Sequence, residues 1–231
     1  MNFIRANLLS LLALVALVLT SVILSSQLPD QIPSRFSFEG ELLDSRPKLL
    51  MLILMPAAYF GLMISVNVLI GISPRRFSMP NSKRAMNQIV FGIGLLFVFL
   101  HYGMLMNEGD YGLFVHYFSI GMAAFLVVTG NVFGKTKRNF FLGIRLPWTI
   151  DTDANWRATH RLCGKLMVIA GVTLFIASFF FTSIVLMLIL ALSPLLIASV
   201  YSLIYFFSYE RHSQPSDEDE NEPDLTEARP D

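Results

Sequence analysis

Six long apolar stretches run through this chain of 231 residues, and polar segments separate them. Crossing a bilayer takes a helix of about 20 mostly apolar residues, and each stretch meets or approaches that length. A helix also satisfies its own backbone hydrogen bonds, as the water-free bilayer core requires. The pattern therefore predicts an all-α, integral membrane bundle of six transmembrane helices, placed roughly at residues 7–26, 49–72, 88–106, 112–132, 162–181 and 183–208.

The composition supports a membrane protein, because 54% of the residues are hydrophobic and 15% are charged. A soluble domain has about 25% charged residues. The first stretch follows Arg5 and resembles a signal peptide, but it ends in Leu24-Ser25-Ser26-Gln27, without an A-x-A cleavage site. We expect it to be retained as a helix. The one cysteine, Cys163, excludes an intrachain disulfide and a metal site built on cysteine pairs.

Lysine and arginine are concentrated on one side of the predicted bundle. The segments 73–87 and 133–165 hold eleven of the seventeen basic residues, and with six spans both lie on the same side. Since basic loops face the cytosol, these segments and both termini are predicted to be cytosolic. The loop 27–48 is then external.

The end of the chain differs from the rest in charge. Residues 210–231 hold nine acids and two bases, and Leu225 is the single large aliphatic residue from 214 onward. Such a segment has too little apolar surface to fold alone, so it is predicted to be a disordered acidic C-terminal tail. It either solubilises the protein or docks on the basic cytosolic loops.

The polar segment 139–165 has the most distinctive composition, because it contains both tryptophans of the chain. Pro147 disfavours a helical conformation at Leu146, so an extended or turned stretch is expected there. Residues 151–153, Asp-Thr-Asp, offer helix N-caps, and a cytosolic interfacial helix is predicted to begin near Ala154.

On that predicted helix, Trp156, His160 and Gly164 are spaced by four residues and share a face. A basic stripe follows one position along, at Arg157, Arg161 and Lys165. Two interpretations stay open. The helix anchors at the interface, with its bases on lipid phosphates, or it forms a binding surface for an acidic or amphipathic partner. Gly164 would let another backbone approach closely.

This segment resembles the SdpI family of bacterial membrane proteins, whose signature is approximately N-x-x-x-G-I-R-T-P-W-T followed by W-x-x-T-H-R-x-x-G-K. Leu146 departs from the usual threonine. The matching positions are Asn139, Gly143, Ile144, Arg145, Pro147, Trp148, Thr149, Trp156, Thr159, His160, Arg161, Gly164 and Lys165.

The external loop is similar to the amino-terminal domain of unknown function that often precedes the SdpI region. Its residues Pro29, Pro33, Phe36 and Gly40 match, whereas Arg35 stands where histidine is usual. Lys48 also matches, and Asp44 lies one position later than in the pattern. The expected layout is an amino-terminal two-helix region at 1–72, an SdpI-like four-helix region at 73–209 and the tail at 210–231.

The resemblance implies a protein of the bacterial inner membrane that confers immunity to an envelope-active toxic peptide and recruits a cytosolic transcriptional repressor. The external loop would meet the peptide through Pro29, Pro33, Arg35, Phe36 and Gly40. The cytosolic motif would bind the partner, with Trp156, His160 and Arg161 as its core, through the set Gly143, Arg145, Pro147, Trp148, Trp156, Thr159, His160, Arg161 and Lys165.

Two other functions stay open. A small secondary transporter would use His101 and His116, although the spans lack acids. We expect these histidines to pair with each other, with Tyr102 or with backbone, and Asn67 to bond between helices. The other alternative is a structural membrane protein without a ligand. Catalytic and phosphate-loop motifs are lacking, so we expect no enzyme activity, cofactor, metal or direct nucleic-acid binding.

Overall fold

The computed structural model describes residues 3–37, 39–72, 80–138 and 142–210. Six of its helices are long and apolar enough to cross a membrane, which confirms the predicted bundle and makes the chain a multi-pass membrane protein. The spanning helices are α1 (Phe3–Leu24), α2 (Lys48–Ile72), α3 (Pro80–Met106), α4 (Tyr111–Phe133), α6 (Asp153–Ala177) and α7 (Ile184–Tyr205), which a π-helical turn, η2 (Phe206–Glu210), extends. The predicted acidic tail beyond Glu210, the loop bases Arg75 and Arg76, and Asn139 lie outside the described residues.

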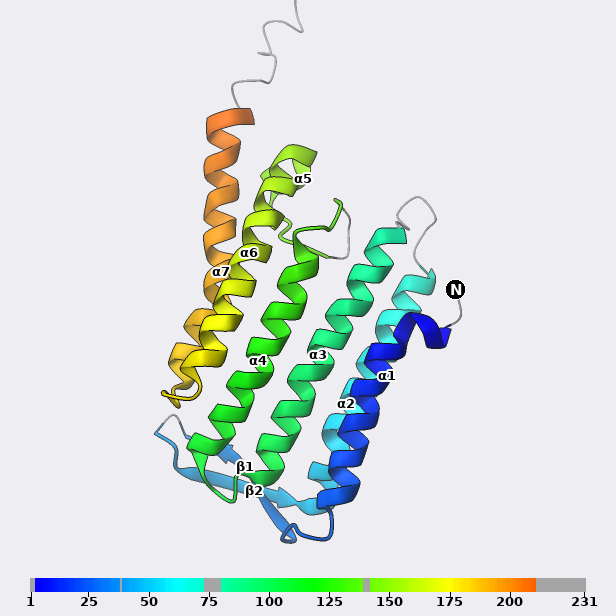
Figure 1. The fold of residues 1–231 in the computed structure, drawn as a ribbon, viewed down its shortest axis with the longest axis vertical. Coiled ribbons are helices and arrows are strands. Elements are labelled where there is room, and N and C mark those ends of the chain that lie inside the picture. The colour runs from blue at the N-terminus through cyan, green and yellow to red at the C-terminus, as the bar shows by residue number, and fades with distance from the viewer. Residues whose placement is uncertain (1–2, 38, 73–79, 139–141, 211–231) are drawn as a thin grey trace, which may run out of the picture.

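The helices run alternately up and down, and α7, α6, α4, α3 and the α1–α2 pair follow one another across the bundle (Figure 1). The first residues of α1 and the last of α7 lie toward the same end. This end also holds the short helix α5 (Pro147–Asp151), and we call it the motif end. The opposite end carries two strands and is called the hairpin end.

Small residues bring α4 and α6 into backbone contact. A Cβ atom built on Gly164 would lie 2.7 Å from the carbonyl oxygen of Gly130, and one built on Gly130 would lie 2.7 Å from the oxygen of Gly164. Any side chain at either position would force the helices apart, as at glycine contacts between membrane helices generally. The expectation that Gly164 allows another backbone to approach is therefore confirmed, and the backbone is that of α4.

The outside of the bundle is apolar, as a surface that faces the lipid of a bilayer must be. Large side chains such as Leu19, Val68, Ile169 and Leu196 are about half exposed or more. Inside, Leu17 and Tyr59 are fully buried between α1, α2 and α3. The first helix thus packs as an integral part of the bundle.

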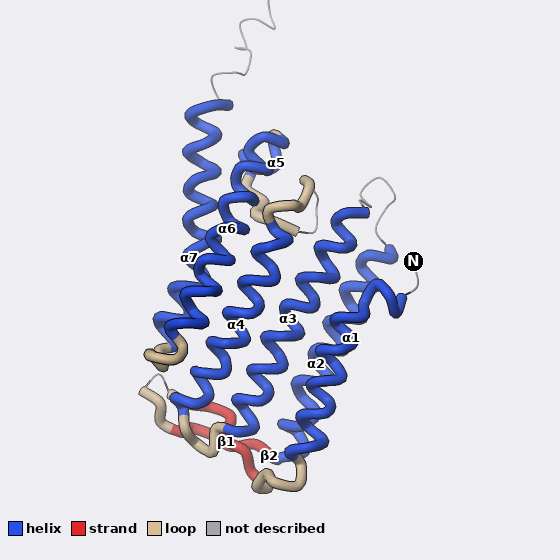
Figure 2. The backbone as a smooth tube through the Cα atoms, viewed as in Figure 1, coloured by secondary structure: helices blue, strands red, loops and turns tan. Residues whose placement is uncertain are grey.

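A two-stranded antiparallel hairpin covers the hairpin end, drawn in red in Figure 2. It consists of β1 (Gln31–Phe36) and β2 (Leu42–Pro47), and its register is irregular between Pro33 and Phe36. Buried Ile32 anchors it in a cluster with Leu28, Met51 and Leu105. The loop had been predicted without strands, since Pro33 and the irregular register disrupt the apolar–polar alternation that marks a strand.

Polar residues within the spans have defined partners. The side-chain amides of Asn7 and Asn67 bond to each other reciprocally, at 3.0 and 3.2 Å, which confirms the interhelical role of Asn67. The imidazole Nε2 of His101 lies 2.8 Å from the Ser21 hydroxyl oxygen. His116 Nδ1 lies 2.7 Å from the backbone oxygen of Ser178. The two histidines thus bond to separate groups, and of the partners expected only the backbone is found, at His116.

Candidate functional site

The motif begins with a bend. Leu146 has an extended conformation, with φ −91° and ψ 152°, and Pro147 starts α5 directly after it. The buried hydroxyl of Thr149 accepts a hydrogen bond from the Leu146 N–H at 2.8 Å and lies 2.9 Å from the Ile144 carbonyl oxygen. The predicted turn is therefore present, and it continues into one short helical turn.

The start of α6 is held from two sides. Thr152, within the predicted capping run 151–153, is the N-cap, and its hydroxyl accepts from the Asn155 N–H at 3.1 Å. Arg138 Nη1 donates to the carbonyl oxygens of Ile150 and Asp151 at 2.8 and 2.7 Å, and its Nε lies 3.2 Å from the Asp153 carboxylate. Arg138 thus satisfies the last carbonyls of α5, which have no partner in the helix.

Two aromatic rings stack on α6. The rings of Trp156 and His160 have centroids 4.0 Å apart and planes inclined by 18°, and Phe133 of α4 stacks on His160 at 5.0 Å. Their spacing of four residues had predicted this shared face. Trp156 is 1% exposed and His160 is fully buried, so the face points into the protein.

Both ring nitrogens of His160 are used. Nδ1 lies 2.8 Å from the carbonyl oxygen of Trp156, and Nε2 lies 3.0 Å from the backbone nitrogen of Ile144. A carbonyl oxygen accepts and an amide N–H donates, so we assign the hydrogen to Nδ1 and leave Nε2 as the acceptor. His160 is therefore a neutral imidazole that joins α6 to the stretch before α5.

Gly143 makes this contact possible. Its φ is +127°, which side chains rarely tolerate, and a Cβ atom would collide with His160 Nε2 and lie 2.7 Å from Trp156 Cη2. The glycine of one half of the motif is therefore required by the tryptophan and histidine of the other half.

A second set of hydrogen bonds ties the motif to α7. Trp148 Nε1 donates to the Ser202 hydroxyl at 2.8 Å, and Asn155 Nδ2 donates to the Ser202 carbonyl at 3.1 Å. Thr159 donates its hydroxyl hydrogen to Asn155 Oδ1 at 3.0 Å. Asn155 and Ser202 were not singled out in the sequence. Asn155 lies one helical turn before Thr159, which is a usable signal, whereas a serine in an apolar helix carries none.

Exposure divides the predicted partner-binding residues into three groups. Trp156, Thr159 and His160 are buried and support the structure, so a partner has no direct access to them. Gly143 and Trp148 are partly exposed. The residues open to solvent are Arg145, Pro147, Arg161 and Lys165. A partner-binding role stays a prediction, and the exposed residues are the ones that would make the contacts.

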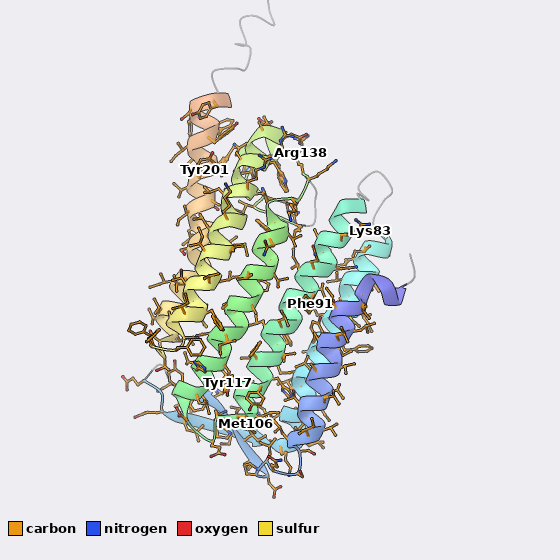
Figure 3. The ribbon with its side chains drawn as sticks, in the orientation of Figure 1. Lys83, Phe91, Met106, Tyr117, Arg138 and Tyr201 are labelled. Carbon is orange, nitrogen blue, oxygen red and sulfur yellow. The ribbon has the colours of Figure 1, made fainter. Side chains whose placement is uncertain are left out.

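A cavity of about 650 Å³ opens beside the buried rings. It is lined by the residues that follow α4 and by the first turns of α6, namely Gly134, Lys135, Thr136, Lys137, Arg138, Asp153, Trp156, Arg157 and Arg161. Figure 3 shows Arg138 at the motif end, and Lys83 of α3 lies toward the same end. Over the described part of the chain, no three His, Cys, Asp or Glu side chains are placed to hold a metal ion.

The predicted external residues also divide into anchors and exposed groups. The Phe36 ring packs against Tyr111 and Phe114, with centroids 5.7 and 6.0 Å apart. Gly40 has φ +91°, and a Cβ there would lie 3.2 Å from the Tyr111 ring. The Pro33 carbonyl lies 3.4 Å from Asn107 Nδ2, and Pro29 and Arg35 are exposed.

Comparison with known proteins bears on the same segments. Residues 135–205 match the model of the SdpI/YfhL protein family. Over this region the chain is therefore similar to that family. The match contains the bend, the buried rings and the hydrogen bonds to Ser202. The shared family region is thus the part of the chain that this network holds together.

A curated relative extends the similarity over most of the chain. Immunity protein SdpI of Bacillus subtilis (strain 168) is 24% identical over 205 residues, which cover 87% of this chain and 96% of the relative. No solved structure matches the chain. The similarity to SdpI therefore extends well beyond the family region.

Proposed function

We propose that this protein is an SdpI-like immunity protein of the bacterial inner membrane, which protects its cell against a toxic peptide acting on the envelope. The observation that carries the proposal is the similarity to Immunity protein SdpI over 87% of the chain and nearly all of the relative. The basic residues of the motif end support a cytosolic orientation for that end and for both termini, by the positive-inside rule.

On the external side, the hairpin would meet the peptide. Phe36 and Gly40 anchor it on the Tyr111 end of α4, whereas Arg35, Leu42 and Leu43 are exposed. Leu42 and Leu43 are 49% and 57% exposed. A two-stranded sheet also presents strand edges to which an extended peptide can add by backbone hydrogen bonds.

On the cytosolic side, a transcriptional repressor would contact the exposed residues of the motif end. The exposed residues there are Arg145, Pro147, Arg161 and Lys165, and the half-buried Trp148 directly follows Pro147 in sequence. The buried residues Trp156 and His160 would hold this surface in shape.

A survival assay tests the immunity function. A strain lacking its own immunity gene would express this protein or its variants while exposed to envelope-active toxic peptides. We expect the wild-type chain to protect, and the double variant Leu42→Ser/Leu43→Ser to lose protection at unchanged membrane levels. Glu41→Gln, at an exposed neighbour in the same hairpin, is the matched control. Failure of the wild-type chain against every such peptide would refute the proposal.

A further inference from the structure

The cavity beside the buried rings is strongly basic. Among the residues that line it, Lys135, Lys137, Arg138, Arg157 and Arg161 are cations and Asp153 is the one acid, so five positive charges less one negative charge give a net of +4. Asp153 is engaged, because its carboxylate lies 3.2 Å from Arg138 Nε. The lining therefore suits an anionic group.

Two of the lining side chains, those of Arg138 and Trp156, make hydrogen bonds within the protein. Arg138 uses Nη1 on two backbone carbonyls of α5 and Nε on Asp153. Trp156 donates its indole N–H to the Thr136 carbonyl at 2.9 Å. Lys135, Arg157 and Arg161 are exposed and line the same cavity. They are the cations we assign to contact with a ligand.

The depth of the cavity places it at the edge of the bilayer. Helix α4 has 23 residues, which correspond to about 35 Å of helix against a hydrocarbon core of about 30 Å. The cavity lining starts at Gly134, the residue after α4 ends. The lining thus begins where the lipid headgroups lie.

The neighbouring helices agree on this level. On α6, three exposed residues are basic, namely Arg157, Arg161 and Lys165. The exposed residue one turn further, Ile169, is apolar. On α7 and the η2 turn that extends it, the outward side chains Ile204 and Phe207 are apolar, and they lie beyond Ser202, which bonds to Asn155 beside Trp156. Apolar surface on α7 therefore reaches the level of the cavity.

We propose that this basic cavity binds the phosphate headgroup of an anionic membrane lipid. An arginine guanidinium matches phosphate oxygens with two parallel N–H donors, and two arginines one helical turn apart on α6 offer such forks. A volume of about 650 Å³ exceeds the size of a bare phosphate and leaves room for the rest of a headgroup. The bound lipid would steady the segment that follows α4 against the start of α6.

The test uses the full-length protein in detergent. It would be titrated with short-chain phosphatidylglycerol, with phosphatidylcholine of the same chain length, and with inorganic phosphate, and binding would be followed by native mass spectrometry. Each cation near an anionic lipid surface contributes roughly fivefold to affinity. We therefore expect Arg157→Gln/Arg161→Gln to weaken phosphatidylglycerol binding by about 25-fold. Both side chains are exposed, so the fold should tolerate the change.

Two further variants make the result specific. Lys83→Gln/Arg84→Gln removes the same charge from exposed positions at the start of α3, outside the cavity, and should leave binding unchanged. Arg157→Lys/Arg161→Lys keeps the charge but removes the forked donors, and should restore only part of the affinity.

Three results would overturn the proposal. The first is equal binding of the two lipids. The second is displacement of phosphatidylglycerol by inorganic phosphate at comparable concentration, which would identify a site for a soluble phosphate. The third is lipid binding that appears only after removal of the acidic residues 214–231, which would identify the chain's own tail as the occupant. Since protection plays no part in these measurements, their failure would leave the proposed immunity function untouched.

Discussion

The imidazole Nε2 of His160 accepts a hydrogen bond from the backbone N–H of Ile144 at 3.0 Å. The other ring nitrogen lies 2.8 Å from the Trp156 carbonyl oxygen, so the ring joins two chain segments 16 residues apart. In the SdpI signature these two residues belong to separate halves. The contact between them shows that the halves pack together as one unit.

Replacing His160 should destabilise the motif end. His160→Leu keeps a large side chain but leaves the Ile144 N–H without an acceptor in the interior, which costs about 1–3 kcal/mol. We expect a lower midpoint of thermal unfolding for the detergent-purified protein and faster proteolysis between residues 138 and 153. Lys165→Ala, at an exposed position on the same helix and outside the cavity, is the control and should leave both measurements unchanged. Equal effects of the two substitutions would contradict a structural role for the imidazole.

Gly143→Ala should be harmful for two separable reasons. The backbone at φ +127° disfavours any side chain, and the added methyl group would collide with His160 and Trp156. Gly109 has φ +91° with nothing within 4 Å of a Cβ atom, so Gly109→Ala measures backbone strain alone. Gly61 has an ordinary backbone conformation and open space around it, so Gly61→Ala introduces neither backbone strain nor a collision.

We expect the stability loss to rise in the order Gly61→Ala, Gly109→Ala, Gly143→Ala. Strain of this kind costs about 1–3 kcal/mol, and overpacking adds a similar amount. Denaturant or thermal unfolding of the three purified variants supplies the comparison. A loss at Gly143 no larger than at Gly109 would show that the stretch before α5 can shift away from the rings.

Trp148 and Ser202 should be energetically coupled. The indole N–H donates to the Ser202 hydroxyl at 2.8 Å, and Trp148→Phe removes the donor while keeping an aromatic ring. Ser202→Ala removes the acceptor. Residues in direct hydrogen-bond contact show interaction energies of about 0.5–3 kcal/mol in a double-mutant cycle.

The double variant should therefore lose less stability than the sum of the two single variants. Asn155→Ala combined with Trp148→Phe is an informative comparison, because Asn155 bonds the Ser202 carbonyl rather than its hydroxyl. That pair should show weaker coupling. Strict additivity for Trp148 and Ser202 would mean that the hydrogen bond does not persist in the folded protein.

The spans could be predicted because the bilayer fixes both their length and their polarity. Tyr111–Phe133, for example, differs from the expected 112–132 by one residue at each end. The helix expected near Ala154 begins at Asp153, since Thr152 caps it locally and Asp153 places an acid in its first turn. The residues that make up such a local signal lie within a few positions of one another, so the signal can be recognised in the sequence alone.

The burial of the motif could not be predicted in the same way. A spacing of four residues places Trp156 and His160 on one face, but it does not say what covers that face. The cover comes from Gly143 and Phe133, through contacts that depend on the tertiary fold. An interfacial surface and a buried core face have the same local pattern, and only the packing separates them.

The hairpin offers the last prediction. The Phe36 ring packs against Tyr111 and Phe114, whereas Leu43 on β2 is 57% exposed. Phe36→Ala removes the ring contacts that hold the hairpin on the start of α4, and the bundle beneath it makes its own contacts between helices. We expect proteolysis at residues 36–42 to become faster while the thermal unfolding midpoint of the bundle changes little. Leu43→Ala removes apolar side-chain atoms from an exposed position of the same hairpin and should leave proteolysis unchanged. If the hairpin meets the toxic peptide, Phe36→Ala should also weaken protection by disordering Arg35, Leu42 and Leu43 together. Faster proteolysis with full protection would separate the hairpin from immunity and direct attention to the motif end.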